Sequence, residues 1–173
     1  TPPADVGQFD VVALSHVLEH LGEVRAAVVS MRELTTPGGY VYLEVPDAEH
    51  YVDHLVAPYH DFNTEHINHF SLGLLDRFMA TQGFEKIVTE HNTVMCSAND
   101  PYPVVRGLWR RVETVGNTDD LAFDDALGAG VARYIDASGA LMAKINAHLT
   151  AEVGDSDGVI VWGAGQLAMK LLS

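Results

Sequence analysis

The chain is short of cysteine, of long apolar runs and of any leader pattern. Cys96 is the only cysteine among 173 residues, which excludes an intrachain disulfide framework and a thiolate zinc cluster. No apolar run reaches the roughly 20 residues that a transmembrane helix needs, and no basic segment followed by an apolar one opens the chain. These absences predict a cytoplasmic protein without a membrane partner.

Basic residues are also few. The sequence has 10 Lys and Arg against 24 Asp and Glu, for a formal net charge of -14. DNA or RNA would be repelled by this charge, so nucleic-acid binding is not expected. Hydrophobic residues make up 47% of the chain, which excludes disorder. The length suits one domain with a real core, or one domain and part of another.

The first hundred residues alternate between strand and helix patterns. Phe9 to Ser15 is an apolar run typical of a parallel strand covered on both faces. Apolar residues recur at helical spacing from Val24 to Leu34, and Tyr40 to Val45 is predicted as the next strand. Ser71 is placed to cap a second helix, and Phe84 to Thr89 begins a third strand. This order predicts an α/β fold with a Rossmann-like, open, mostly parallel sheet.

The pattern changes after Cys96. We expect residues 1–98 to form part of a first domain, 99–157 a helical linker region and 158–173 the start of a second Rossmann-like domain. Ala122 to Glu152 is rich in alanine and long enough for one helix, or for two helices joined near Gly128-Ala129-Gly130.

The last residues combine a strand pattern with a glycine-rich turn. Gly158 to Trp162 is predicted as a buried strand, and Gly163-Ala164-Gly165 follows it directly before a helical pattern. This is the structural context of a dinucleotide fingerprint. The alternative is a tight strand-to-helix turn in which small residues serve packing.

His16-Val17-Leu18-Glu19-His20 matches the H-x-x-E-H pattern of inverted zinc peptidases. Zinc chemistry requires both histidines on one helix, with the glutamate as base. His16 directly follows a predicted strand, however, and ligands of open α/β sheets bind outside the carboxyl ends of strands. Leu14, Ser15 and His16 are therefore expected to line a nucleoside cofactor, unless the turn is purely structural. Glu19 and His20 are expected to be ordinary helix residues.

A histidine-rich loop follows, with His50, His54, His60, His66 and His69. A free imidazole has a pKa of about 6.5, which suits proton transfer near neutral pH. Two alternatives stay open. One is a polar, exposed loop. The other is a metal site in which His50 and His54, at i, i+4 spacing, are joined by ligands from Glu65, His66 and His69.

Several segments together resemble one enzyme family. "FDVVALSHVLEHL", then a helix, then "TTPGGYVYLEVPD", resembles the fourth and fifth strands of a class I S-adenosylmethionine-dependent methyltransferase. "TEHINHFSLGLLDRFMATQGFE" is similar to the segment that follows in a subgroup that methylates sugars on carbon, usually as nucleotide-linked ketosugars. "VIVWGAGQLAMKLL" resembles the opening of that subgroup's C-terminal Rossmann-like domain.

The resemblance implies S-adenosylmethionine as cofactor and a small-molecule substrate, a nucleotide-sugar. It places a general base at His66, with Glu65 beside it to orient the base or polarise the substrate. Asn63 is expected to contact the substrate, and Gly163 and Gly165 belong to the domain that helps hold the nucleotide-sugar. The rival hypotheses are a zinc-dependent hydrolase built on the histidines and a nucleotide-sugar or dinucleotide-binding module without catalysis.

The cofactor-holding parts of class I enzymes come before the fourth strand. Only eight residues precede Phe9 here, and the chain ends in the first helix of the apparent second domain. The resemblance therefore implies a fragment of a longer protein, inactive by itself. The strand from Phe9 to Ser15 would then expose one edge, and exposed edges promote association. The isolated chain is therefore expected to self-associate or to fold poorly.

Overall fold

The computed structural model describes residues 6–98, 100–116, 123–154, 158, 160–163 and 165–172. Within them, four strands form one sheet in the order β1-β2-β4-β3. The strands are β1 (Phe9–Ser15), β2 (Thr35–Pro46), β3 (Phe84–Ser97) and β4 (Asp100–Arg111). β1 pairs in parallel with β2, and β4 pairs antiparallel with both β2 and β3. β1, β2 and β3 thus run in one direction and β4 in the other. This confirms the predicted open α/β fold; the sheet was expected to be mostly parallel and is mixed, since only the β1–β2 pairing is parallel.

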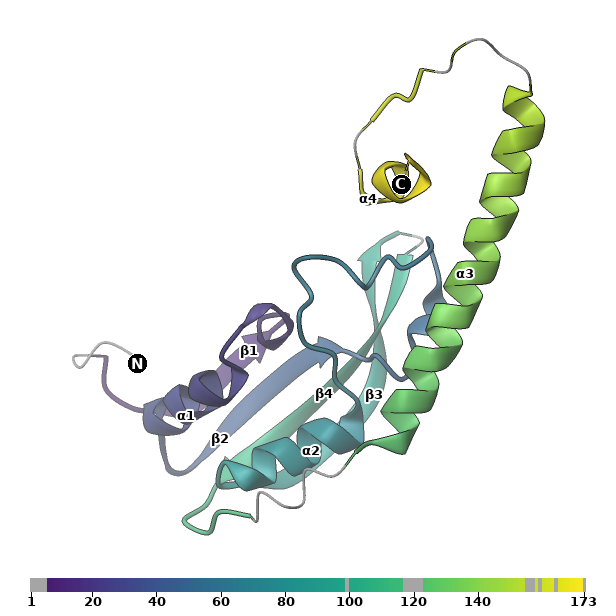
Figure 1. The fold of residues 1–173 in the computed structure, drawn as a ribbon. Helices are drawn as coiled ribbons and strands as arrows, with labels where there is room; N and C mark the ends of the chain where they lie inside the picture. The colour runs from purple at the N-terminus through teal and green to yellow at the C-terminus, as the bar shows by residue number, and fades with distance from the viewer. Residues whose placement is uncertain are drawn as a thin grey trace.

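Two helices pack on one face of this sheet (Figure 1). They are α1 (Val24–Leu34) and α2 (Leu72–Thr81). Their buried residues join those of the sheet in one apolar cluster: Val28, Met31, Leu75, Met79, Val41, Leu43, Val45, Val105 and Trp109. As predicted, Ser71 caps α2, because its Oγ accepts a hydrogen bond from the Leu74 N–H at 3.0 Å.

β1 lies at an edge of the sheet and pairs only with β2 among the described residues. Phe9 and Val11 are 47% and 57% exposed. The open strand edge expected from the sequence is therefore present in the part of the chain that the structure describes. The sequence also predicted that β1 is covered on both faces of the sheet. In the described residues it is not, because α1 packs on one side only.

Residues 100–111 form strand β4, where the sequence predicts a helical linker over 99–157. β4 turns back from β3 and enters the sheet between β3 and β2. Pro101 and Pro103 argued against a strand here, because proline is rare in sheet interiors. Both prolines precede Val104, where the ladder with β2 begins, so their missing N–H groups interrupt no pairing with that strand. The predicted boundary at residue 98 falls inside the β3–β4 hairpin.

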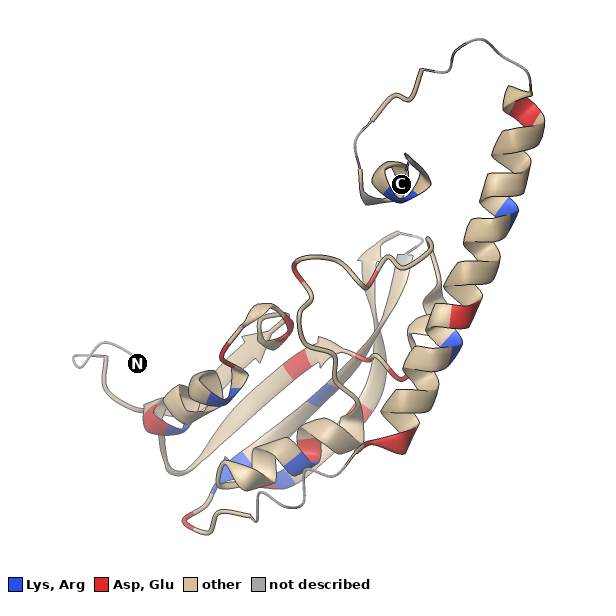
Figure 2. Ribbon diagram, in the orientation of Figure 1, with Lys and Arg blue, Asp and Glu red and all other residues tan. Residues whose placement is uncertain are grey.

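The arginines of β4 make ion pairs across this hairpin. Arg106 lies 2.6 Å from Glu90, and Arg110 lies 2.5 Å from Glu85, its direct cross-strand partner. Figure 2 shows both basic and acidic segments on the strands of the sheet. Exposed pairs of this kind contribute at most about 1 kcal/mol each, so they set the register of the hairpin more than its stability.

One long helix, α3 (Asp125–Val153), runs beside the sheet and projects beyond it (Figure 1). It continues through Gly128 and Gly130, so the one-helix alternative is confirmed. Gly130 marks the closest approach to the sheet domain, because a Cβ at this position would lie 2.5 Å from the Glu49 carbonyl oxygen. Neither α3 nor any other helix in the described residues has the length and apolarity to cross a membrane.

The last described residues differ from the expected pattern. Residues 158 and 160–163 belong to no strand, and Ile160 and Trp162 are 92% and 98% exposed. The predicted buried strand from Gly158 to Trp162 is wrong for these residues, because no neighbouring strand is present there to pair with them. α4 (Gln166–Leu172) follows as the predicted helix. A second Rossmann-like domain over 158–173 stays a prediction.

Asp124 joins the N-termini of α3 and α2. Its Oδ1 accepts the Leu127 N–H at 3.0 Å, and its Oδ2 accepts hydrogen bonds from Ser71 Oγ at 3.0 Å and Arg77 at 2.8 Å. Burial by itself raises the pKa of Asp124, but these hydrogen bonds together lower it below 3.8. The ionised form is therefore the one that the fold stabilises.

Asp124→Ala is expected to lower the free energy of unfolding at neutral pH by about 1 kcal/mol, the usual loss on removal of a helix cap. Because the folded pKa is lowered, the contribution is present above the unfolded pKa near 3.8 and lost as the pH falls through the folded value. Urea unfolding at several pH values measures both effects. Asp125→Ala removes the same charge from an exposed neighbour and is the control; equal losses in the two variants would contradict the capping role.

Candidate active site

β1 and β2 end side by side, and the chain turns sharply there. His16 follows β1, and its N–H donates to the Glu44 carbonyl oxygen at 2.9 Å. Its φ of +53° lies in the left-handed region, which is costly for a residue other than glycine. A short 3-10 helix, η1 (Leu18–His20), comes next. The predicted strand-to-helix turn at His16 is confirmed.

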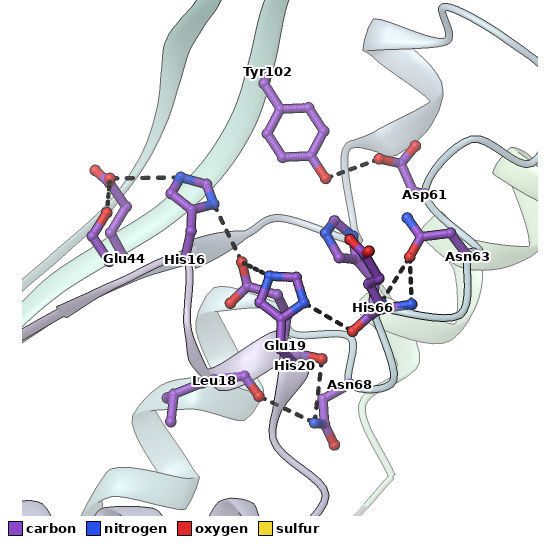
Figure 3. Close-up of polar contacts among 12 residues, drawn as sticks. His16, Leu18, Glu19, His20, Glu44, Asp61, Asn63, His66, Asn68 and Tyr102 are labelled. Atoms are coloured by element: carbon purple, nitrogen blue, oxygen red, sulfur yellow. Dashed lines mark hydrogen bonds and ion pairs between the residues drawn. The ribbon is translucent and has the colours of Figure 1, made fainter. Parts of the chain in front are cut away.

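The H-x-x-E-H segment does not form one helix. His16 precedes η1 with left-handed backbone geometry, so the two histidines do not sit one helical turn apart as inverted zinc peptidases require. Glu19 is not an ordinary helix residue either, since its side chain is only 1% exposed. Its Oε1 lies 3.3 Å from His16 Nδ1 and 3.7 Å from His20 Nε2 (Figure 3). A buried carboxylate therefore stands between two imidazoles.

The histidine-rich loop is fixed on η1 by hydrogen bonds to main-chain atoms. Asn68 Nδ2 donates to the carbonyl oxygens of Leu18 and Leu21, at 3.1 and 2.7 Å. His20 Nδ1 lies 2.9 Å from the Glu65 carbonyl oxygen. Each of these contacts has a main-chain carbonyl oxygen as its partner. The position of the loop is therefore fixed relative to the turn after β1. The loop therefore brings the predicted base to the turn.

His66 lies half-buried in this loop. Its ring centroid is 5.0 Å from that of His20, and its Nδ1 is buried with no hydrogen-bond partner among the described residues. Burial lowers the pKa of His66 below 6.5, although the charge of Glu19 acts to raise it. The neutral imidazole, which can accept a proton, is therefore the main form at neutral pH.

Ser15 and Leu14, expected near the cofactor, face different surroundings. Ser15 is exposed, and its Oγ donates to Glu44 Oε1 at 2.9 Å, next to His16. Leu14 packs its side chain against the apolar core. Leu14 is partly buried, whereas Ser15 and His16 present polar side chains at the end of the sheet, and a cofactor contact at any of the three stays a prediction.

Asn63 and Glu65 shape the turn that carries His66. Asn63 Oδ1 accepts the N–H groups of Glu65 and His66, both at 2.8 Å (Figure 3). Glu65 is exposed, and within the described residues its carboxylate forms no hydrogen bond or ion pair with His66, although its charge favours the protonated imidazole. Asn63 therefore orients the main chain at His66, and a substrate contact by Asn63 or Glu65 stays a prediction.

Gly163 and Gly165 are not joined to this group by any contact that the described residues make. Both are exposed, and a Cβ on either would meet no atom within 4 Å. Ala164 lies outside the described residues. α4 meets the histidine-rich loop through Lys170, whose Nζ donates to the Tyr59 carbonyl oxygen at 2.6 Å. A role of the two glycines in nucleotide-sugar binding stays a prediction.

The aromatic side chain of Tyr102 lies beside His16, a contact that the sequence did not predict. The ring centroid of Tyr102 is 6.4 Å from that of His16, and its hydroxyl donates to Asp61 Oδ1 at 2.9 Å. Burial, with the charge of Asp61 and the hydrogen bond to it, raises the pKa of Tyr102, so the phenol stays protonated. Tyr102 lies on β4, a strand that the sequence pattern did not reveal, so no spacing rule could have placed it here.

Residues 2–90 match the family model described as a methyltransferase domain. This match covers just over half of the 173 residues. The α/β sheet and the turn at the end of β1 agree with it. The chain belongs to the methyltransferase domain family, and S-adenosylmethionine, the cofactor expected from the sequence, is the cofactor that this family implies. No curated protein matches the chain.

Solved structures provide a comparison of the fold. A chain in the complex that contains the Haloferax volcanii Trm112 methyltransferase activator is 10% identical, with a TM-score of 0.51 over 68% of this chain and 60% of that chain. A SAM-dependent methyltransferase from Methanosarcina mazei is 12% identical, with a TM-score of 0.47 over 61% of this chain and 60% of that chain. The chain thus spans 60% of the length of both structures, and the likeness concerns the fold.

Proposed function

We propose that the protein to which this chain belongs transfers a methyl group from S-adenosylmethionine to a carbon atom of a ketosugar linked to a nucleotide, with His66 as general base. The observation that carries the proposal is the half-buried, neutral imidazole of His66 held beside the turn after β1. Family membership supports the transfer of a methyl group. The choice of carbon and of a ketosugar rests on the resemblance of the loop that contains Glu65 and His66.

The residues around His16 suit the donor. S-adenosylmethionine, when bound, supplies an electrophilic methyl group on a positively charged sulfonium. Glu44 and Glu19 flank His16 at the end of the sheet. Neither carboxylate oxygen of the buried Glu19 accepts a hydrogen bond from the residues that the structure describes. Two carboxylates so placed create a negative potential that favours a cationic ligand.

His66 would act on the acceptor. A carbon next to a ketone is acidic, and the neutral imidazole can remove a proton from it. The electron pair of the broken C–H bond would then form an enolate, whose carbon would bond to the methyl group while the electron pair of the C–S bond stays on the departing thioether. The proton leaves the imidazolium for solvent, which the partly exposed ring allows. Neutral His66 is needed at the start of this sequence, which agrees with the direction of its pKa shift.

The test uses the full-length protein, methyl-labelled S-adenosylmethionine and a nucleoside-diphosphate ketosugar. Carbon-13 NMR is expected to show the labelled methyl bonded to carbon. In heavy water without the donor, the hydrogen beside the ketone is expected to exchange for deuterium. Label on oxygen or nitrogen would overturn the choice of acceptor atom. Failure to bind S-adenosylmethionine and to transfer the label to any acceptor would overturn the methyl-transfer function.

A further inference from the structure

A second group of histidines surrounds Asp47, apart from the group at the end of β1. The Asp47 side chain is 1% exposed, and its Oδ2 lies 2.7 Å from both His50 Nδ1 and His91 Nδ1. The two imidazole rings meet edge to face, with centroids 4.8 Å apart. Each of the three residues offers one ligand atom, and these atoms all lie within 4.8 Å of one another. Two imidazole nitrogens and one carboxylate oxygen thus lie close enough together to share one metal ion.

The register of the sheet brings Asp47 and His91 close together. Val105 of β4 pairs with Val45 of β2 on one side and with His91 of β3 on the other. Asp47 comes two residues after Val45, on the same face of the chain. Its N–H donates to the Pro103 carbonyl oxygen at 3.0 Å, which extends the β2–β4 contact by one step. His91 and Asp47 are therefore placed by main-chain hydrogen bonds of three strands.

The carboxylate of Asp47 is itself oriented. Its Oδ1 accepts the Glu49 N–H at 3.2 Å, so Oδ2 is the oxygen turned toward the imidazoles. Backbone support of this kind is what fixes carboxylate ligands at metal centres. The side chains of His50 and His91 are 37% and 47% exposed, which leaves the outer side of the group open to water or another ligand.

We propose that Asp47, His50 and His91 bind a divalent transition-metal ion such as Zn²⁺. Two imidazoles and one carboxylate are a common ligand set for such ions, with the remaining positions open. In the structure each Nδ1 lies at hydrogen-bond distance from Asp47; a metal ion would take the place of the shared hydrogens. Metal–ligand bonds of about 2.0–2.1 Å separate tetrahedral ligand atoms by about 3.3 Å, so the exposed imidazoles would move outward by roughly half an ångström.

A second cluster, Glu19, His20 and His66, also has ligand atoms within 4.8 Å of one another. It contains the proposed base, which must keep a free nitrogen, so we assign the metal to Asp47. The sequence alternative paired His50 with His54. The structure instead pairs His50 with His91, a residue of β3 far along the chain.

Calorimetric titration of the full-length protein with Zn²⁺ alone tests the site. One equivalent is expected to bind, more weakly at lower pH because the ligands must lose their Nδ1 hydrogens. His50→Gln and His91→Gln each keep an N–H donor for Asp47 but remove the imidazole ligand, and each is expected to weaken binding at least about tenfold. Circular dichroism checks that both variants fold as the parent does.

His54→Gln is the matched control, because it changes the histidine that spacing alone would have chosen and is expected to leave binding unchanged. Absorption of the Co²⁺ form gives a second readout, since imidazole and carboxylate ligands produce visible bands that the glutamine variants would lose. Absence of Zn²⁺ binding, or binding that is equal in the parent and in His91→Gln, would overturn the assignment. Neither result bears on methyl transfer, which is measured separately.

Discussion

Replacement of His66 by glutamine is expected to lower kcat for methyl transfer by about 10²–10⁴-fold, the usual contribution of a general base. Glutamine cannot accept the proton from the acceptor carbon. The dissociation constant of S-adenosylmethionine is expected to stay within about twofold, because the donor would bind at the end of β1 and His66 lies on the loop above it. Steady-state kinetics and equilibrium titration of the full-length protein measure the two quantities.

The pH dependence separates a base from a structural histidine. Neutral His66 is the active form, so the rate should fall as the pH drops through its pKa. Burial lowers this pKa below 6.5 in the free protein, so the acidic limb of kcat/KM, which reports the free enzyme, is expected below pH 6.5. In His66→Gln this limb should vanish. A limb that persists unchanged in the variant would assign it to another group.

His60→Gln serves as the control for both measurements. His60 lies in the same loop, its side chain is exposed, and only its main chain takes part in the hydrogen bonds of the turn. Its replacement is expected to change neither kcat nor the pH profile. Full activity in His66→Gln, or an equal loss in both variants, would remove His66 from the role of base.

The first half of the sheet could be predicted from the sequence because its signals are local. The apolar run of β1, the helical spacing of α1 and the cap at Ser71 each depend on a few consecutive residues. β4 could not be predicted, since its prolines and its glycine argue against a strand and its stability comes from pairing with β2 and β3. Local patterns contain no information about those partners.

The same distinction applies to the candidate site. His16 could be placed at the mouth of the sheet because the rule for ligand sites refers to strand ends. The surroundings of Glu19 could not, because its burial depends on Ile67 and Asn68, which lie nearly fifty residues later in the chain and dock on η1. His91 likewise has no signal near Asp47 in the sequence; only the register through Val105 brings the two together.

Trp109→Ala is expected to lower the free energy of unfolding by about 3–5 kcal/mol, the range for deleting a fully buried aromatic side chain. Trp109 is 1% exposed and belongs to the cluster between the sheet and its helices. Its ring lies against Gly107, where a Cβ would come within 2.5 Å of Trp109 Cη2. The missing side chain of Gly107 makes room for the indole, so Gly107 has no side chain that could fill the cavity. Because the total free energy of unfolding of a typical domain is about 5–15 kcal/mol, this loss would be a large part of the stability.

The chain provides its own control, because its only other tryptophan is Trp162, which is 98% exposed. Trp162→Ala is expected to change the free energy of unfolding by no more than about 0.5 kcal/mol. It also leaves Trp109 as the sole indole, so a red shift of its fluorescence in urea reports the opening of the sheet alone. Equal stabilities of the two variants would mean that Trp109 is not the packing centre of the sheet. A large loss confined to Trp109→Ala would show that β4, the strand that sequence patterns did not predict, contributes a central residue to the core between the sheet and its helices.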